Sequence, residues 1–468
     1  MEKAHFGMIG LGTMGRNFLL NIAEHGISGV GFDLDAVKRD LLLKEGAGMP
    51  VDVGNDMADF IDKLESPRNI MMLVPAGPIV DSVIADLLPH LEKDDLIIDG
   101  GNSHFTDTDR READLAAKGV GFMGVGVSGG EEGARHGASI MPGGRRDFYD
   151  RIEKTLQAVS AKVNGEPCVA YMGAGSAGQF VKMVHNGIEY GLMQILSETY
   201  DFMQHVLKMD YPAMAQAFSD WNDSELNSFL VEITATVLKK SDPDTGNPLV
   251  SMILDTAGQK GTGKWTSQAA MDFGIPIPTI DSAVSMRQIS SQKTTRAGIA
   301  AKYSGNASAD GSIRATLDDL KKALLCSFIA TYAQGLSLLQ AASKEKNYNL
   351  NLAECAKIWR GGCIIRSALL EEMRVAYTKD PALPNLLLDD KFAALLGENN
   401  ASWRTVIGAF TADGIPSLCF SSALNYFEAF RTERLPANLV QAQRDFFGAH
   451  TYQRIDKEGT FHTSDWEK

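Results

Sequence analysis

The sequence has few cysteines, and none stands in a pattern that binds metal or forms a disulfide framework. Its five cysteines are scattered and include no C-x-x-C pair. In a chain of this length such spacing argues against structural disulfides and zinc sites, and it fits a reducing cytosol. The nine histidines show no ligand spacing either. We therefore expect a cytoplasmic protein without a bound metal.

The sequence also lacks a long hydrophobic run and an excess of positive charge. No apolar run reaches about 18 residues, so no membrane-spanning helix is expected. A strand pattern begins within the first residues, MEKAHFGMIG, so no signal peptide is expected. The net charge of −14 disfavours nucleic acid as a partner, although an anionic small molecule could still bind in a local cationic pocket.

At 468 residues the chain is too long for a single hydrophobic core, and its pattern divides it into three parts. The first part, 1–177, alternates apolar runs with helical patterns, which predicts a doubly wound, mostly parallel α/β sheet. The second, 178–434, has helix-period segments and few strand signals, which predicts a large all-α domain. The third, 435–468, is a polar tail that must dock on something else. The predicted strands are 6–10, 29–33, 69–74, 96–100, 120–125 and 168–173.

A glycine cluster follows the first predicted strand. Gly10, Gly12 and Gly15 form GLGTMG, a G-x-G-x-x-G, and a helical pattern follows at once. These glycines let the backbone turn sharply, so the pyrophosphate of a dinucleotide can approach the N-terminus of the helix. Asp33, 18 positions after Gly15, ends the second strand and could accept hydrogen bonds from the ribose hydroxyls. The cluster predicts a Rossmann-like domain; the alternative is that the glycines only serve strand–helix packing.

One stretch of the second part places five polar side chains on the same side of a helix. In KMVHNGIEY the spacing 0, 3, 4, 7 and 8 puts them on one face. They are Lys182, His185, Asn186, Glu189 and Tyr190. This combination is unusual for a solvated surface and predicts a functional face. An exposed face with a Lys–Glu pair is the simpler alternative.

Two glycine-rich loops of the first part add polar groups at strand ends. GVSGGEEGARHG supplies Ser128, Gly129 and Gly130, whose permissive backbone can offer hydrogen-bond donors. DGGNSH follows another strand and supplies Asn102. In an open parallel sheet, ligands bind outside the carboxyl ends of the strands. Both loops fit that position.

The stretch GQKGTGKWT has the spacing of an ATP-type phosphate loop but departs from it at one position. Gly258, four residues, Gly263 and Lys264 reproduce G-x-x-x-x-G-K. Trp265 stands where such a loop needs Ser or Thr to hold magnesium. The spacing leaves two interpretations, a phosphate site of another kind or a turn that carries Lys260 and Lys264.

Taken together, these motifs resemble the 6-phosphogluconate dehydrogenase family over essentially the whole chain. GLGTMG, IIDGGNSHF, GVSGGEEGARHG, KMVHNGIEYGLMQ, DTAGQKGTGKWT and QAQRDFFGAHTY occur in the family's order. The resemblance implies oxidative decarboxylation of 6-phospho-D-gluconate to ribulose 5-phosphate and CO2, in the pentose phosphate pathway, with reduction of NAD or NADP. It also implies a homodimer in which the tail, 435–468, of one subunit completes the site of the other. The second part, 178–434, would then be the substrate and dimerisation domain.

The resemblance also implies roles for individual residues. Lys182 would be the base for the C3 hydroxyl, and Glu189 the acid that protonates the enediol. Neither step needs a metal. Substrate binding would involve Asn102, Ser128, Gly129, Gly130, His185, Asn186, Tyr190, Lys260 and Arg287, with Arg444 and His450 from the neighbouring subunit. Cofactor binding would involve Gly10, Leu11, Gly12, Thr13, Met14, Gly15, Asp33, Leu34, Asp35, Val74, Pro75, Ala76 and Asn102.

The sequence departs from the family where the 2′-phosphate of NADP would bind. The second strand of the common form ends in Asn-Arg-Thr, but this chain has Asp33, Leu34 and Asp35. A lysine common after the third core strand is replaced by Pro75. A lost arginine fork and an added carboxylate predict that NAD is preferred over NADP. The alternative is that Lys38 or Arg39 supplies the missing positive charge.

Two other functions remain open at this level. Another β-hydroxyacid dehydrogenase would act on a small hydroxy acid without phosphate, but such an enzyme has no need of Lys260, Arg287, Arg444 and His450. A non-catalytic dinucleotide-binding sensor could keep the glycines, but it has no need of Lys182 and Glu189 on one helix face.

Overall fold

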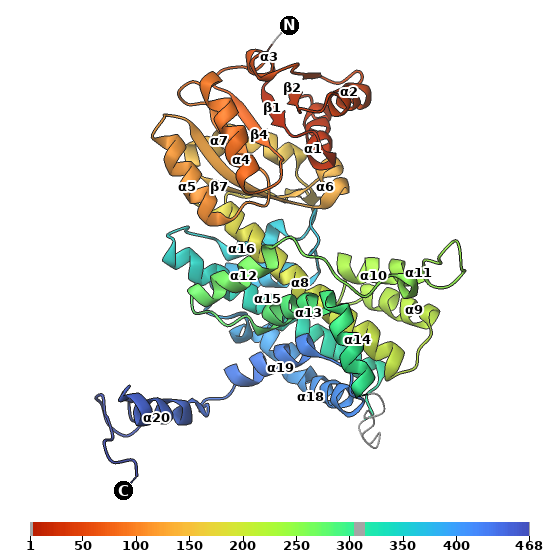
Figure 1. Ribbon diagram of the computed structural model, residues 1–468, viewed down its shortest axis with the longest axis vertical. Coiled ribbons are helices and arrows are strands. Elements are labelled where there is room, and N and C mark those ends of the chain that lie inside the picture. Colours follow the sequence, from red (N-terminus) through yellow and green to blue (C-terminus); the bar gives the residue numbers. More distant parts are fainter. Residues whose placement is uncertain (1–2, 304–313, 468) are drawn as a thin grey trace. The chain divides into compact units, whose positions relative to one another are not determined.

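The computed structural model describes residues 3–303 and 314–467. The chain forms two compact units, Met1–Ala423 and Leu424–Lys468, and each is described by itself (Figure 1). The first unit contains a β-sheet with its helices, followed by a large group of helices.

The sheet has seven strands in the order β3-β2-β1-β4-β5-β6-β7. Every neighbouring pair is parallel except β6 and β7, which are antiparallel. The order in which strands are added reverses between β1 and β4, at the centre of the sheet, and open sheets of this kind bind ligands at such a point. The strands are β1 (Phe6–Ile9), β2 (Gly29–Phe32), β3 (Val51–Val53), β4 (Asn69–Met72), β5 (Leu96–Asp99), β6 (Gly121–Ser128) and β7 (Ser139–Gly144).

The predicted doubly wound sheet is confirmed, but the prediction of a strand at 168–173 is wrong. That segment makes only isolated bridges, Ile140 to Val169 and Gly143 to Gly173. The strand at the edge of the sheet is instead β7, whose sequence SIMPGG reads locally as a turn. A proline can stand in a strand when that strand lies at a sheet edge, because one row of backbone groups there needs no partner. The short strand β3, at the other edge, was also missed.

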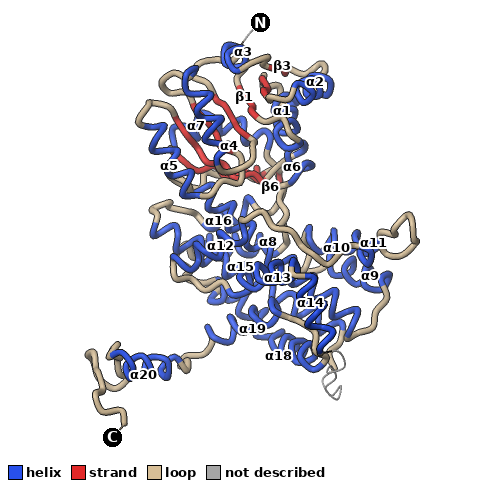
Figure 2. Tube along the Cα trace, viewed as in Figure 1, coloured by secondary structure: helices blue, strands red, loops and turns tan. Residues whose placement is uncertain are grey.

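Helices cover both faces of the sheet (Figure 2). One core cluster combines Ile98 of β5 with side chains of α1 and α7, and the other combines Ile97 with side chains of α3, α4 and α5. Neighbouring side chains along a strand point to opposite faces, so a strand buried on both faces is apolar throughout. The helices of this part are α1 (Thr13–Glu24), α2 (Ala36–Glu45), α3 (Met57–Asp62), α4 (Pro78–Leu87), η1 (Leu88–His90), α5 (Phe105–Ala116), α6 (Gly130–His136) and α7 (Arg146–Val159), and a two-stranded ribbon, β8 (Lys162–Val163) and β9 (Glu166–Pro167), follows α7.

The rest of the first unit is helical, as predicted. Its longest helices, α8 and α15, pack against each other, and α8 also contacts β6 and β7. The helix α8 therefore links the sheet to the helical part. The helices are α8 (Ala177–His205), α9 (Tyr211–Asn222), α10 (Phe229–Lys239), α11 (Leu249–Met252), α12 (Thr262–Asp272), α13 (Pro278–Ser291), α14 (Lys293–Lys302), α15 (Leu317–Glu345), α16 (Leu352–Ile358), α17 (Leu369–Lys379), η2 (Leu386–Leu388), α18 (Asp390–Ala412) and α19 (Leu418–Phe430).

Helix α15 is long and apolar enough to cross a membrane by length and composition alone. Within the described residues it is the one such helix, and 89% of its apolar window is buried inside the protein. Its hydrophobicity is therefore explained by its place in the core of the helical part.

The boundary between the units falls within α19, and the second unit also contains α20 (Ala437–Gly448) and the chain that follows it. The carboxylate of Asp445 accepts hydrogen bonds from the backbone N–H of Thr451 at 2.9 Å and of Thr463 at 3.0 Å, and from the indole of Trp466 at 3.1 Å. One buried carboxylate thus fixes the loops around α20. Several apolar side chains of this unit, including Phe447, which is 73% exposed, are not covered within it.

Candidate active site

The glycine cluster forms the sharp turn between β1 and α1. A Cβ on Gly15 would stand 1.9 Å from the carbonyl oxygen of Gly10, so this position tolerates no side chain. At Gly12, which precedes the first residue of α1, a Cβ would meet nothing within 4 Å. No side chain caps this helix end. The backbone N–H groups of the first turn of α1 are therefore open to an anionic ligand.

Asp33 is tied directly to the glycine turn. Its Oδ2 accepts a hydrogen bond from the backbone N–H of Leu11 at 2.8 Å. The Nζ of Lys38 pairs with the same oxygen at 3.3 Å, and Arg39 donates to the backbone oxygen of Asp33 at 2.5 Å. Both cations considered as substitutes for the missing arginine thus lie against Asp33. The side chain of Leu34 is 91% exposed, and Asp35 caps α2.

The loops after β1, β4 and β5 meet at one edge of the sheet. A Cβ on Gly10 would lie 2.6 Å from the carbonyl oxygen of Leu73, and one on Gly101 would lie 3.0 Å from that of Val74. Val74 and Asn102 therefore belong to adjoining loops beside the glycine turn. Asn102 is exposed at the tip of its loop. The structure brings together the segments that carry the predicted cofactor residues.

Lys182 is buried where α8 crosses β6. Its side chain is 6% exposed, and a Cβ on Gly126 of β6 would lie 2.4 Å from the Cβ of Lys182. The missing side chain at Gly126 thus lets the helix approach the strand closely. Burial lowers the pKa of Lys182, and the nearby Glu189 carboxylate opposes that shift. Burial raises the pKa of Glu189, opposed by Lys182 and Arg287. A neutral lysine and a protonated glutamic acid are the forms that a base and an acid need.

His185 and its neighbours complete this face of α8. The Nε2 of His185 lies 3.3 Å from the Oγ of Ser128, and its Nδ1 lies 3.1 Å from the Oδ1 of Asn186. Burial holds the pKa of His185 well below its usual value, so the imidazole is neutral. The alternative of a solvated Lys–Glu face is therefore wrong, because Lys182, His185 and Tyr190 are all buried.

A second cluster lies two turns further along α8. The guanidinium of Arg287 lies 3.5 Å from the ring centroid of Tyr190 and donates to the carbonyl oxygen of Gly258 at 3.0 Å. A Cβ on Gly263 would lie 2.5 Å from the Tyr190 ring. The structure thus joins Tyr190, Arg287 and the loop that carries the exposed Lys260.

Trp265, in the first turn of α12, packs against the loop that carries Lys260. Its ring lies against Gly261, which has a φ of +107°, and meets the ring of His104 edge-on at 5.1 Å between centroids. His104 follows Asn102 in the loop after β5. The indole therefore connects the loop of Lys260 to the loop of Asn102, in a position where a magnesium-binding loop has a hydroxyl.

Two family models of known proteins match this chain, and together they cover nearly all of it. Residues 5–173 match the family described as NAD binding domain of 6-phosphogluconate dehydrogenase. Residues 178–466 match 6-phosphogluconate dehydrogenase, C-terminal domain. The chain belongs to the 6-phosphogluconate dehydrogenase family.

Individual relatives match over their full length. A Bacillus subtilis protein named 6-phosphogluconate dehydrogenase, NADP(+)-dependent, decarboxylating, is 48% identical over 470 residues, covering 100% of both chains. A Rattus norvegicus 6-phosphogluconate dehydrogenase, decarboxylating, is also 48% identical, over 100% of this chain and 97% of its own. The solved Plasmodium falciparum 6-phosphogluconate dehydrogenase, described in apo form and in complex with NADP+ and 6-phosphogluconate, matches with a TM-score of 0.95 at 44% identity over 98% and 99% of the two chains.

These relatives bear on the cofactor. The Bacillus subtilis protein is named NADP(+)-dependent, and the Plasmodium falciparum protein was studied with NADP+. The family assignment therefore supports an NAD(P)-binding domain in this chain, but it does not support the predicted preference for NAD.

Two predicted substrate residues of this 6-phosphogluconate dehydrogenase family member lie outside the first unit. Arg444 and His450 belong to the second unit, where Arg444 donates to the Oε1 of Gln441 at 3.0 Å. The first unit alone therefore does not contain all of the predicted substrate-binding residues. Within the described residues, no three His, Cys, Asp or Glu side chains converge as a metal site would require.

Gln179 is a further residue on this face of α8, and the sequence analysis did not predict it. It lies one turn before Lys182 on α8, and its Nε2 donates to the backbone oxygen of Asp99, at the end of β5, at 2.9 Å. Its Oε1 is buried without a hydrogen-bond partner. Extending the i, i+3 face of α8 backward from Lys182 would have found it. Gln179 fixes the helix of Lys182 to the strand that precedes Asn102.

Proposed function

We propose that the chain catalyses the oxidative decarboxylation of 6-phospho-D-gluconate to D-ribulose 5-phosphate and CO2 with reduction of NAD(P). The main support is Lys182 of α8, which is buried against Gly126 of β6 and whose pKa is lowered by that burial. Relatives that match the whole chain carry the name of this activity.

Lys182 starts the reaction as a neutral amine. It takes the proton of the C3 hydroxyl as the C3 carbon loses hydride, and this gives a 3-keto acid. The nicotinamide ring of the bound dinucleotide supplies the hydride acceptor. The protonated Lys182 then donates a hydrogen bond to the new carbonyl oxygen and stabilises the negative charge that develops there.

Decarboxylation follows without a metal because the C3 carbonyl is itself the electron sink. The bond to the carboxylate breaks, CO2 leaves, and the electron pair forms an enediol as Lys182 gives its proton to the C3 oxygen. Glu189 then protonates the enediol at the carbon that becomes C1 of ribulose 5-phosphate, while Lys182 takes back the hydroxyl proton. The raised pKa of Glu189 keeps the acid form available.

The other predicted residues bind and orient the substrate. Tyr190, Lys260 and Arg287 would hold the phosphate, with a fork from Arg287 and a point charge from Lys260. The carboxylate and hydroxyls would be oriented by Asn102, Ser128, Gly129, Gly130, His185 and Asn186. We infer further phosphate contacts from Arg444 of the partner subunit and His450 of the partner subunit.

We also propose that NAD is preferred over NADP. The Asp33 carboxylate beside the glycine turn would accept hydrogen bonds from free ribose hydroxyls but repel a 2′-phosphate, and the exposed Leu34 offers no donor. The test is the absorbance increase at 340 nm with 6-phosphogluconate and equal, subsaturating NAD or NADP. Faster reduction of NADP would keep the activity and contradict the preference, and no reduction of either would contradict the activity.

The pH dependence of kcat/KM should be bell-shaped. Activity falls at low pH because Lys182 becomes protonated, and it falls at high pH because Glu189 loses its proton. Burial lowers the pKa of Lys182 and raises the pKa of Glu189, so the two limbs move toward each other and belong to the coupled pair. Glu189→Gln should lower kcat by about 10²-fold and remove the alkaline limb. An alkaline limb that is unchanged in the variant would rule out Glu189 as the acid.

We infer a homodimer with the three-part organisation 1–177, 178–434 and 435–468. Support comes from the second unit, where Phe446 and Phe447 are exposed on one chain. Light scattering should give the molar mass of two chains, and Phe447→Asp should shift it to one chain and lower activity in parallel, because a buried carboxylate opposes docking. A single-chain mass for the active wild-type protein would contradict the dimer.

A further inference from the structure

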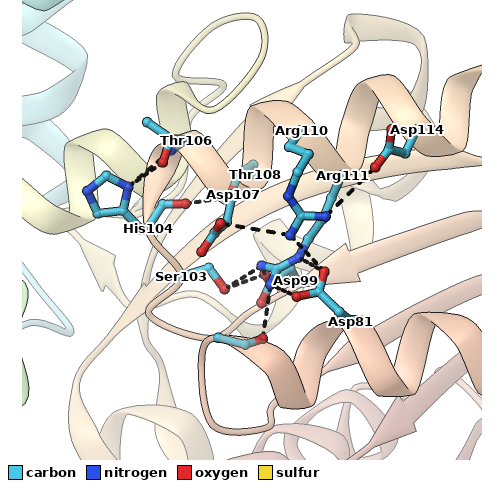
Figure 3. Close-up of polar contacts among 11 residues, drawn as sticks. Asp81, Asp99, Ser103, His104, Thr106, Asp107, Thr108, Arg110, Arg111 and Asp114 are labelled. Atoms are coloured by element: carbon cyan, nitrogen blue, oxygen red, sulfur yellow. Dashed lines mark hydrogen bonds and ion pairs between the residues drawn. The ribbon is translucent and has the colours of Figure 1, made fainter.

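We propose that Arg111 of α5 is a positioning residue that holds together the two loops on which dinucleotide binding depends. One is the loop between β4 and α4, with Val74 and Ala76. The other is the loop between β5 and α5, with Asn102. The inference rests on the proposed function, since it takes these loops to be the cofactor loops. Figure 3 shows the guanidinium between them.

Arg111 contacts the carboxyl-terminal end of the first loop and the helix that follows that loop, α4. Its Nη2 donates to the carbonyl oxygen of Gly77 at 3.0 Å. Its Nε and Nη2 form a two-pronged pair with the Oδ1 and Oδ2 of Asp81, both at 2.9 Å. Gly77 has a φ of +93° and immediately precedes α4, while Asp81 lies in its first turn. A planar fork fixes both position and direction, which a single bond does not.

Arg111 holds the second loop through Ser103 and Asp99. Its Nη1 donates to the Oγ of Ser103 at 3.4 Å and lies 3.7 Å from the Oδ2 of Asp99. Asp99 in turn accepts from Ser103 Oγ at 2.6 Å and from the backbone N–H of Gly101 at 3.0 Å. The residues on both sides of Asn102 are thereby fixed, although Asn102 itself is exposed.

The part of the network formed by Arg111, Ser103 and Asp99 is buried, whereas the Asp81 side chain is 41% exposed. The Arg111 side chain is 2% exposed and the Asp99 side chain 0%. Burial raises the pKa of Asp99, and Arg111 and Ser103 oppose that shift. A buried charge without its partner is costly, so removing Arg111 should let the loops relax to other arrangements.

The neighbouring Arg110 provides a matched control. Its Nη2 also contacts Asp81, at 2.9 Å, but its side chain is 49% exposed, and its other ion pairs are with Asp107 and Asp114 of its own helix. Arg110 and Arg111 therefore share one partner, but the contacts to Gly77 and Ser103 are made by Arg111.

The experiment compares Arg111→Lys and Arg111→Met with Arg110→Met. Fluorescence titration with reduced nicotinamide dinucleotide should give a Kd raised about tenfold in both Arg111 variants, because small displacements of binding groups are expensive. The Kd for 6-phosphogluconate without cofactor should rise less than about threefold, since Lys260 and Arg287 are untouched. Arg110→Met should change neither Kd by more than about twofold.

Thermal unfolding separates positioning from general stability. An Arg111 variant that loses stability but binds the dinucleotide as tightly as wild type would overturn the proposal, as would an equal effect of Arg110→Met. If Arg111→Met does not fold, Ser103→Ala removes one link and should raise the dinucleotide Kd by about threefold; an unchanged Kd overturns the proposal. Because the titration needs no turnover, a failure of the proposed reaction would be seen separately, as wild-type protein that binds dinucleotide but does not reduce it.

Discussion

Replacing Lys182 by methionine should lower kcat by about 10³- to 10⁴-fold and leave dinucleotide binding within about twofold of wild type. Methionine keeps the length and apolar stem of the side chain but has no nitrogen to take the C3 hydroxyl proton. The side chain is 6% exposed, so its removal should not expose a new surface. Single-turnover absorbance at 340 nm measures the chemical step, and titration with reduced dinucleotide measures binding.

A matched control for this variant is Lys264→Met. Lys264 completes the phosphate-loop spacing but is exposed at the start of α12. Its replacement should change kcat by less than about twofold. Turnover near the wild-type rate in Lys182→Met would eliminate Lys182 as the base, whereas loss of dinucleotide binding would mean that the variant is misfolded or that Lys182 binds the cofactor.

The second large effect is expected from the double substitution Asp33→Asn with Leu34→Arg. It should shift the ratio of kcat/KM for NADP to that for NAD by about 10²- to 10³-fold toward NADP, because a carboxylate is removed and an arginine fork is added. Asparagine can still accept the hydrogen bond from the backbone N–H of Leu11, so the glycine turn should keep its shape. Initial rates with both dinucleotides measure the ratio.

Lys38→Met in the otherwise wild-type chain tests the alternative source of positive charge. Lys38 pairs with Asp33 at 3.3 Å. If Lys38 serves the 2′-phosphate, its loss should lower kcat/KM for NADP about tenfold and leave NAD unaffected. Suppose that Lys38→Met lowers kcat/KM for NADP in this way and that the double variant leaves the ratio of kcat/KM for NADP to that for NAD unchanged. The residues at the end of β2 would then not determine which dinucleotide is preferred.

The face of α8 shows what can be predicted from residues that are close in the sequence. Lys182, His185 and Glu189 are separated by one and two turns of a helix, and helical geometry alone places them together. The loops of Asn102 and Ser128 were predicted from a rule of topology, because the carboxyl ends of parallel strands share one edge. In both cases the relevant geometry lies within one element or follows from the order of elements.

The edge strands show where local sequence fails. The segment 168–173 has a strand-like apolar pattern but makes only bridges, whereas SIMPGG, with a proline and two glycines, forms β7. Pairing between distant segments decided which of them joined the sheet, and that competition cannot be read from either segment alone.

The sequence by itself determined the family, the dinucleotide turn and the polar face of α8, because each depends on residues that are only a few positions apart in the chain. Tertiary structure decided the burial that shifts the pKa of Lys182 and Glu189, since it arises where α8 crosses β6. It also determined which of two adjacent arginines is buried. Arg110 and Arg111 are equivalent in sequence, but packing leaves one half-exposed and buries the other between two loops. Burial is a property of what surrounds a residue, and distant segments supply those surroundings.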